Sequence, residues 1–235
     1  MAVVRQTSAT AVGSDSNTVT VNKPSGLAAG DLMILVVNTR GNPWTVTTSP
    51  STGAWTTIAE YIFVAGSVGV STRWRIADAG DAGAASFTWT SPIGVKWTAV
   101  IARYTGHHAT VPIGDHAGGG AASGTASMVA PAVAGTLDGA VFCDWFSRDI
   151  QSTFSTVSTL AKIDGTTTGG LTTGGGGSNA TSTTQGKTLT AGGSTGTFTT
   201  TAGAAEIYTS YTIAIEPVTV AAAPPMLTMP PISNF

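Results

Sequence analysis

The sequence predicts an all-β protein, and three observations support this prediction. Segments of alternating apolar and polar residues recur along the chain, turn residues separate them at short intervals, and no segment shows a convincing helical period. About ten strands joined by short polar turns are typical of two antiparallel sheets packed face to face. We therefore expect residues 1–217 to form a two-sheet antiparallel β-sandwich of the jelly-roll-like kind.

The first two predicted strands lie on either side of a Gly-Asp turn. Residues 17–24 (NTVTVNKP) alternate and stop at a proline, and residues 31–40 (DLMILVVNTR) contain an apolar run of strand length. A strand that is apolar in a continuous run is expected to be buried on both faces. Gly30 can take a positive φ and Asp31 can accept bonds from nearby backbone amides, so we interpret this pair as a turn that starts a buried strand.

Further strands follow at short spacing. We expect them at residues 55–66, 68–78, 85–91, 96–106, 126–135, 139–147, 187–202 and 205–217. A second Gly-Asp pair, Gly80-Asp81, is interpreted as the turn before the strand at 85–91. Residues 149–164 are rich in β-branched and hydroxyl side chains, which lower helix propensity, so we expect strand and loop there rather than a short helix.

Two segments depart from the strand pattern. Residues 164–186 consist largely of Gly, Thr and Ser, which cannot bury a core, so we expect a long exposed loop within the domain. Residues 218–235 contain four prolines, which favour an extended arm over a helix or a central strand. A solvated extension is one interpretation of this arm. The other, which we favour, is docking on a neighbouring protein through the apolar residues Met226, Leu227, Met229, Ile232 and Phe235.

Composition excludes several classes of function. The net charge is −2, charged residues make up 9% of the chain, and Lys and Arg form no cluster, so the positive surface that binds nucleic acid is missing. No segment has the length and apolar character of a membrane-spanning helix or a signal peptide. We expect no nucleic-acid partner, no membrane insertion, and synthesis and assembly in a cytoplasm. Cys143, the single cysteine, lies in an apolar run and is expected to be buried.

No residue pattern selects a catalytic or metal site. His107, His108 and His116, with Asp115 beside the last, match no zinc-ligand spacing, and adjacent strand residues point to opposite faces. We interpret this segment as a polar loop between the sheets, with a metal site as the weaker alternative. The serines lack the strand–turn–helix context of a nucleophile elbow. No pair stands out among the carboxylates that glycoside hydrolysis would use: Glu60, Asp78, Asp81, Asp144, Asp149, Glu206 and Glu216. We expect no catalytic residue, no cofactor and no metal.

Tryptophan is frequent, and exposed indole rings can stack on sugars. Trp74, Trp89, Trp97 and Trp145 fall in predicted strands and are expected in the core. Trp44, in RGNPWTV, precedes a Thr-rich stretch and is the tryptophan that we expect to be exposed. It is the candidate contact for a glycan.

Five motifs occur in a fixed order: PSGLAAGDLMILVV, TGAWTTIAEY, STRWRIADAGDAGAASFTWT, WTAVIARYTG and YTSYTIAIEP. In this order the chain resembles a β-sandwich domain that recurs in minor tail proteins and other virion proteins of tailed bacteriophages, and in some prophage-derived bacterial proteins. The resemblance covers about residues 15–217 and is clearest before residue 106. It implies a structural or adhesive role without catalytic residues. The long Gly/Thr-rich segment and the Pro-rich arm depart from the pattern.

These observations lead to one expectation and two alternatives. We expect a non-enzymatic structural component of a bacteriophage virion, a minor tail protein that contacts other virion proteins and further copies of itself through the sandwich and the arm. One alternative is a capsid decoration protein. The other is a carbohydrate-binding adhesion module that contacts a glycan on the host surface.

Overall fold

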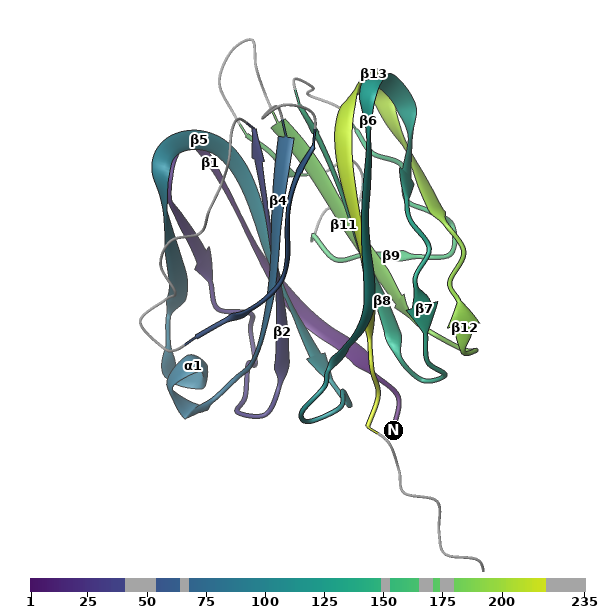
Figure 1. Ribbon diagram of the computed structural model, residues 1–235. Coiled ribbons are helices and arrows are strands. Elements are labelled where there is room, and N and C mark those ends of the chain that lie inside the picture. Colours follow the sequence, from purple (N-terminus) through teal and green to yellow (C-terminus); the bar gives the residue numbers. More distant parts are fainter. Residues whose placement is uncertain (41–53, 64–67, 149–152, 165–170, 174–179, 219–235) are drawn as a thin grey trace, which may run out of the picture.

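Antiparallel β-sheets make up most of the chain, as the alternating segments predict (Figure 1). The computed structural model describes residues 1–40, 54–63, 68–148, 153–164, 171–173 and 180–218. Strands account for 69% and helix for 3% of these described residues, so the all-β prediction is confirmed. In the described part of the chain, no helix is long and apolar enough to cross a membrane.

The first half of the chain forms a five-stranded sheet in the order β1-β5-β2-β4-β3. All neighbouring strands in this sheet are antiparallel. A short helix, α1 (Ala79–Gly83), connects β4 to β5. The strands are β1 (Val4–Asn22), β2 (Leu32–Arg40), β3 (Thr56–Phe63), β4 (Val68–Ile76) and β5 (Ser86–Thr105).

The second half forms a sheet in the order β10-β11-β8-β13-β6, with β9 also paired to β11. Two short strands, β7 and β12, pair with each other outside it. The strands are β6 (Ile113–Ala130), β7 (Ala134–Gly135), β8 (Ala140–Arg148), β9 (Ala161–Lys162), β10 (Leu171–Thr172), β11 (Ala180–Thr188), β12 (Gly193–Ser194) and β13 (Phe198–Ile215).

Strand β2 shows why the sequence forms layers. Its residues alternate between two hydrophobic cores: Leu32, Ile34 and Val36 lie in a central core that contains residues of both sheets, whereas Met33, Leu35 and Val37 lie in an outer core. All six side chains are fully buried. The prediction that this strand is buried on both faces is therefore confirmed.

The outer cores are closed by the longest strands, which pair as β1 with β5 and β6 with β13. Both pairs contain register shifts, which bend and twist a strand. Figure 1 shows both ribbons curving over at the end opposite the N-terminus. The part of each ribbon beyond the bend covers the outer face of its own sheet. Phe87 and Trp89 do so in the first half, and Phe198 does so in the second.

The two sheets repeat one topology. Strands β1, β5, β2 and β4 occupy the same relative positions as β6, β13, β8 and β11. Across the central core β2 contacts β8, β5 contacts β11, and β4 contacts β13. Exchange of each strand for its equivalent leaves this set of contacts unchanged, as a two-fold rotation would. We call residues 4–105 the first half and residues 113–215 the second half.

Backbone hydrogen bonds repeat as well. The N–H of Gly30 donates to Ala77 O (2.8 Å) before β2, and the N–H of Asp138 donates to Leu189 O (3.2 Å) before β8. Both residues have positive φ, 92° for Gly30 and 65° for Asp138. Aspartate is one of the few non-glycine residues that tolerate this conformation. The equivalent turns therefore have the same geometry with different residues.

The predicted loop at residues 164–186 is wrong in its last part. Residues 180–188 form β11, which pairs with β8 along its full length. The side chains of Thr183 and Thr184 are fully buried and donate hydrogen bonds to Asp164 and Asp144. Threonine is β-branched and suits a strand once its hydroxyl has a partner. Residues 165–170 and 174–179 lie outside the described residues.

Two smaller predictions also need correction. Residues 4–16 and 113–125, to which no strand was assigned, belong to β1 and β6. The pair Gly80-Asp81 lies within α1 and not in a simple turn. The prediction of strand and loop in residues 149–164 is confirmed in the part that the structure describes, where β9 is the regular element and no helix is present.

Candidate functional site

The first Gly-Asp pair holds the fold together. The carboxylate of Asp31 accepts hydrogen bonds from the N–H of Ala28 (2.8 Å) and from Nε of Arg103 (2.6 Å). Arg103 extends from β5 on the outer face of the first sheet, so the turn is fixed to a neighbouring strand. This carboxylate is therefore structural, as the interpretation of the pair as a turn requires.

The second Gly-Asp pair belongs to a capping box. Asp78 accepts from the N–H of Asp81 (2.8 Å), and Asp81 accepts from the N–H of Asp78 (3.0 Å). Arg75 binds both carboxylates at 2.6 Å. The N–H of Asp81 lowers the pKa of Asp78 by donating to its charged form. Both acids serve to begin α1.

The three histidines point to separate places. His107 is buried, and its ring nitrogens lie 3.0 Å from the carbonyl oxygens of Gly30 and His108. His116 is exposed on β6, and its Nδ1 lies 2.6 Å from the hydroxyl of Tyr211. The prediction of one polar loop is therefore wrong for His116, which lies in a strand. Among the described residues, no group of three or more His, Cys, Asp or Glu side chains is placed to hold a metal ion.

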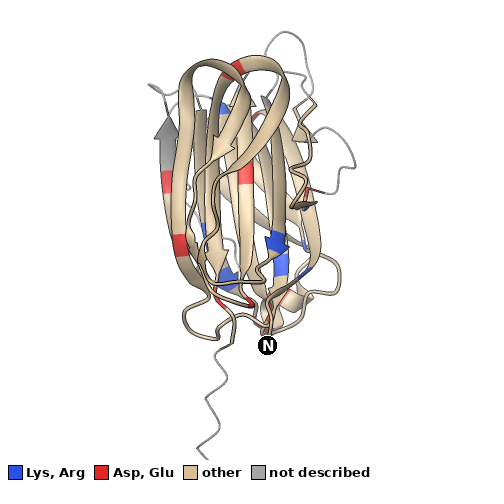
Figure 2. Ribbon diagram, turned by 90° about the vertical axis from the view of Figure 1, so that its right-hand side faces the viewer, with Lys and Arg blue, Asp and Glu red and all other residues tan. Residues whose placement is uncertain are grey.

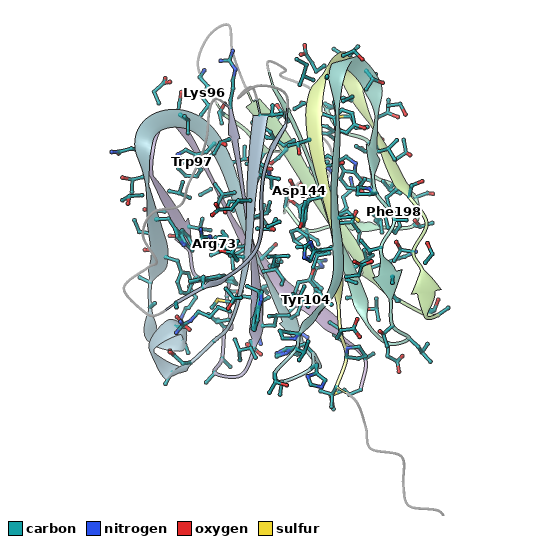
Figure 3. All side chains as sticks on the ribbon, viewed as in Figure 1. Arg73, Lys96, Trp97, Tyr104, Asp144 and Phe198 are labelled. Atoms are coloured by element: carbon teal, nitrogen blue, oxygen red, sulfur yellow. The ribbon has the colours of Figure 1, made fainter. Side chains whose placement is uncertain are left out.

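The tryptophans follow the prediction where the structure describes them. Trp89, Trp97 and Trp145 are buried, the first two in the outer core of the first half and the third in that of the second half. Trp74 is partly buried against the central core. Figure 3 shows Trp97 on the outer side of the first sheet. Trp44, the candidate glycan contact, lies outside the described residues.

A polar layer crosses the central core. Asp144 lies on β8 at the position that Val36 takes on β2, and Figure 3 shows it between the sheets. Its carboxylate accepts from the hydroxyl of Thr184 (2.8 Å). The hydroxyl of Thr98 on β5 donates to Ser182 on β11 (2.7 Å), which joins the two sheets. Burial raises the pKa of Asp144 to about 7.

Two more of the carboxylates considered for hydrolysis, Glu60 and Glu216, have structural partners. Glu60 pairs with Arg73 (2.6 Å), and Glu216 accepts from Thr136 (2.5 Å). Asp164, a buried acid that the sequence did not indicate, accepts from the N–H of Thr184 (3.1 Å). Asp149 lies outside the described residues. No Asp or Glu lines the groove formed by residues 153–156 and 201–203 or the groove formed by residues 187 and 189–195.

One shallow groove lies beside the bend of β13. It has a volume of about 470 Å³ and is lined by Thr153, Phe154, Ser155, Thr156, Thr201, Ala202 and Gly203. Its main hydrogen-bonding groups are already engaged, because Ser155 exchanges bonds with Thr201 and accepts from Thr200. Two residues that line the groove, Phe154 and Ala202, belong to the outer core of the second half. The groove therefore offers few free hydrogen-bonding groups to a ligand.

Both ends of the described chain lie at one end of the molecule (Figure 1). The N–H of Val3 donates to Asp138 O (2.6 Å), and the N–H of Val218 donates to Gly106 O (2.9 Å). The predicted docking residues Met226, Leu227, Met229, Ile232 and Phe235 lie outside the described residues. The point from which the arm starts is nevertheless fixed, because Val218 is bonded to the loop between the halves.

Charge is sparse over the whole described surface. Figure 2 shows Lys and Arg as separate positions that form no continuous stripe along a strand.

Comparisons with known proteins give no match: neither a family model, nor a curated protein, nor a solved structure matches this chain. The fold alone defines its class, an all-β protein built from two halves of the same topology.

Proposed function

We propose that this protein is a non-enzymatic structural component of a bacteriophage virion, located in the particle as a minor tail protein. In this proposal the body is a two-sheet β-sandwich related to jelly rolls, which packs against other virion proteins and copies of itself. Residues 218–235 are an extended arm that docks on a neighbour. The motif order that resembles phage β-sandwich domains is the starting point of the proposal.

The observation that carries the proposal is the use of polar side chains in the described part of the chain. Arg75 and Arg103 hold turns through Asp81 and Asp31, and Asp144 is sealed in the central core. A catalytic site brings reactive groups together around a cavity with room for a substrate. Here these groups are separated and serve the fold, so the architecture favours a structural role.

Two alternatives share the same body. A capsid decoration protein would use the same sandwich and arm in many copies on the head. A carbohydrate-binding module would use an exposed aromatic ring, for which Trp44 is the candidate. The proposal of a tail protein places the chain in few copies per particle.

The test is quantitative mass spectrometry of intact particles from a phage that encodes this chain. The proposal predicts that the protein copurifies with particles through a density gradient, in a few copies relative to the major capsid protein. Copies comparable in number to the capsid protein would instead identify a decoration protein. Absence from purified particles would refute the proposed function.

Lack of hydrolase activity is a separate expectation of the proposal. Purified protein should release no reducing sugar and no peptide from bacterial cell walls. Release that a single Asp or Glu substitution abolishes would show that a catalytic site exists and would contradict the structural role.

A further inference from the structure

Exposed aliphatic side chains gather at the end of the molecule where the described chain begins and ends. Seven large apolar side chains are exposed in the described part of the chain, and five of them lie at this end. We call these five the terminal patch: Met1, Val4, Val111, Leu137 and Val218. Contiguous exposed apolar surface marks an interaction site more often than scattered single residues do.

Hydrogen bonds join the segments that carry three of these side chains, Val111, Leu137 and Val218. Glu216 connects two of its members. Its N–H donates to Pro112 O (2.9 Å), next to Val111, and its carboxylate accepts from the hydroxyl of Thr136 (2.5 Å), next to Leu137. Val218 follows two residues after Glu216. Val111 and Leu137 therefore lie on segments that are bonded to the segment from which the arm starts.

The turn that carries Leu137 does not require a large apolar side chain. Leu137, which is 54% exposed, lies in the turn before β8. The equivalent turn before β2 carries Ala29 at the corresponding position, immediately before the residue with positive φ. The backbone around Leu137 is held by the bond from Gly139 N–H to Thr136 O (2.9 Å). A large apolar side chain is thus presented rigidly where the first half has a small one.

We propose that the terminal patch binds residues 219–235 of a second copy of this chain, in a reciprocal two-fold contact. The chemistry of the two surfaces matches, because residues 219–235 contain no Lys, Arg, Asp or Glu and six large apolar side chains, Val220 and the five docking residues. Rigid proline-rich segments give up little conformational entropy on docking. The patch supplies an apolar surface for them.

The starting point and the length of the arm favour a second copy. Strand β13 runs toward the terminal patch, so the arm starts at this end of the molecule, after Val218. Met226 is eight residues further on, and Phe235 is seventeen. At about 3.1 Å per residue in an extended proline-rich chain, this is a reach of roughly 25–50 Å. In a two-fold contact each arm starts beside the partner's patch and needs no reversal to reach it.

This inference rests on the proposed function for the role of the arm, but its test uses purified protein alone. Sedimentation equilibrium of the full chain should give a dimer. The full-length variant Met226→Ser/Leu227→Ser/Met229→Ser and the patch variant Val111→Ser/Leu137→Ser should each dimerise at least tenfold more weakly. The matched control Val12→Ser/Val129→Ser, which changes the two exposed valines outside the patch, should remain a dimer.

A milder variant distinguishes loss of the dimer contact from misfolding of the protein. Leu137→Ala gives the second turn the residue type of the first, so it should keep the wild-type melting temperature and still weaken the dimer. A synthetic peptide of residues 219–235 in excess should dissociate the wild-type dimer. A full chain that stays monomeric, including one whose arm folds back on its own patch, would overturn the inference, as would a patch variant that dimerises normally. A dimer that is absent from particles would refute the proposed function and leave this inference intact.

Discussion

The two halves share a topology but fix their outer faces by different chemistry. In the first half Arg73 and Arg75 on β4 form salt bridges to Glu60 and Asp81. The equivalent residue to Arg73 on β11 is Gln185, which bonds the backbone of Val157 (2.8 Å) and also Ser155. At this position each half has a long polar side chain that bonds a neighbouring segment, which is β3 in the first half and residues 155–157 in the second. The first half uses a charged pair for this bond and the second half uses a neutral amide.

The two halves also place side-chain volume at different positions. Trp74 of β4 corresponds to Gly186 of β11, by their pairing with Ile34 and Phe142. A Cβ on Gly186 would lie 2.5 Å from the carbonyl oxygen of Val141 and 2.9 Å from Ile163. In the second half Ile163 fills space in the central core, so β11 has no room for a side chain at position 186. The same core is filled from a different segment in each half.

The largest effect is expected in the aromatic outer core of the first half. Trp89 is fully buried and packs on Trp55 with ring centroids 5.5 Å apart. Trp89→Ala should lower the free energy of unfolding by about 3–5 kcal/mol, as measured by urea denaturation. The second half has Thr200 at the equivalent position, and Thr200→Ala should cost only about 1 kcal/mol for one hydrogen bond. Equal losses for the two variants would contradict this assignment of the cores.

The second prediction concerns the pair Val36 and Asp144. The folded-state pKa of Asp144, about 7, is raised above the ordinary value of 3.8, so the folded protein keeps this proton to higher pH than the unfolded chain. Stability should therefore fall as pH rises from about 4 to about 7. One proton with this shift corresponds to a loss of roughly 4 kcal/mol. Denaturation curves across this range measure the loss.

The matched variants isolate Asp144 from the neighbouring charges, chiefly Asp164 and Lys162. Asp144→Asn cannot ionise and should flatten the fall in stability with pH. Asp15→Asn, at an exposed carboxylate, should leave it as in the wild type. A wild-type slope in Asp144→Asn would show that other groups cause the pH dependence.

Backbone space in the second half supports a third prediction. Gly186→Ala should destabilise the protein by about 1–3 kcal/mol, because the new methyl group meets Val141 O and Ile163. Gly83→Ala, where nothing lies within 4 Å of the added Cβ, should cost less than about 0.5 kcal/mol. Thermal unfolding distinguishes the two. A neutral Gly186→Ala would mean that Ile163 does not occupy this space.

The smallest effect is expected at the equivalent turns. Gly30→Asp copies the residue that the second half uses at positive φ, and should cost about 1 kcal/mol or less. Gly30→Val should cost more, because a β-branched residue is strained in this conformation. If both variants unfold at the same temperature, the two turns do not share a conformation.

Sequence reasoning recovered the parts of the fold whose signal is local. The apolar run of β2 has strand length, and Gly30-Asp31 has turn chemistry, so both were predicted correctly. Strand β11 was missed because its threonines become buried only when acids distant in the sequence, Asp144 and Asp164, accept their hydroxyls. Composition alone cannot supply those partners.

The internal repetition was missed for a related reason. Equivalent positions hold unlike residues, such as Trp74 and Gly186 or Val36 and Asp144, so the sequence shows no repeat. The retained signals are few, among them the arginine that ends β2 and the one that ends β8. The terminal patch could not be predicted either, because Val111, Leu137 and Val218 come together only through the chain path around Glu216.

The central claim is that the arm of one copy docks on the terminal patch of another, and one disulfide experiment tests it directly. Two full-length variants, Leu137→Cys and Met229→Cys, are mixed under mild oxidation. The native Cys143 is buried and does not compete. A disulfide-linked heterodimer on a non-reducing gel is the predicted result. A yield no higher than that of the control mixture, Val12→Cys with Met229→Cys, would contradict the account.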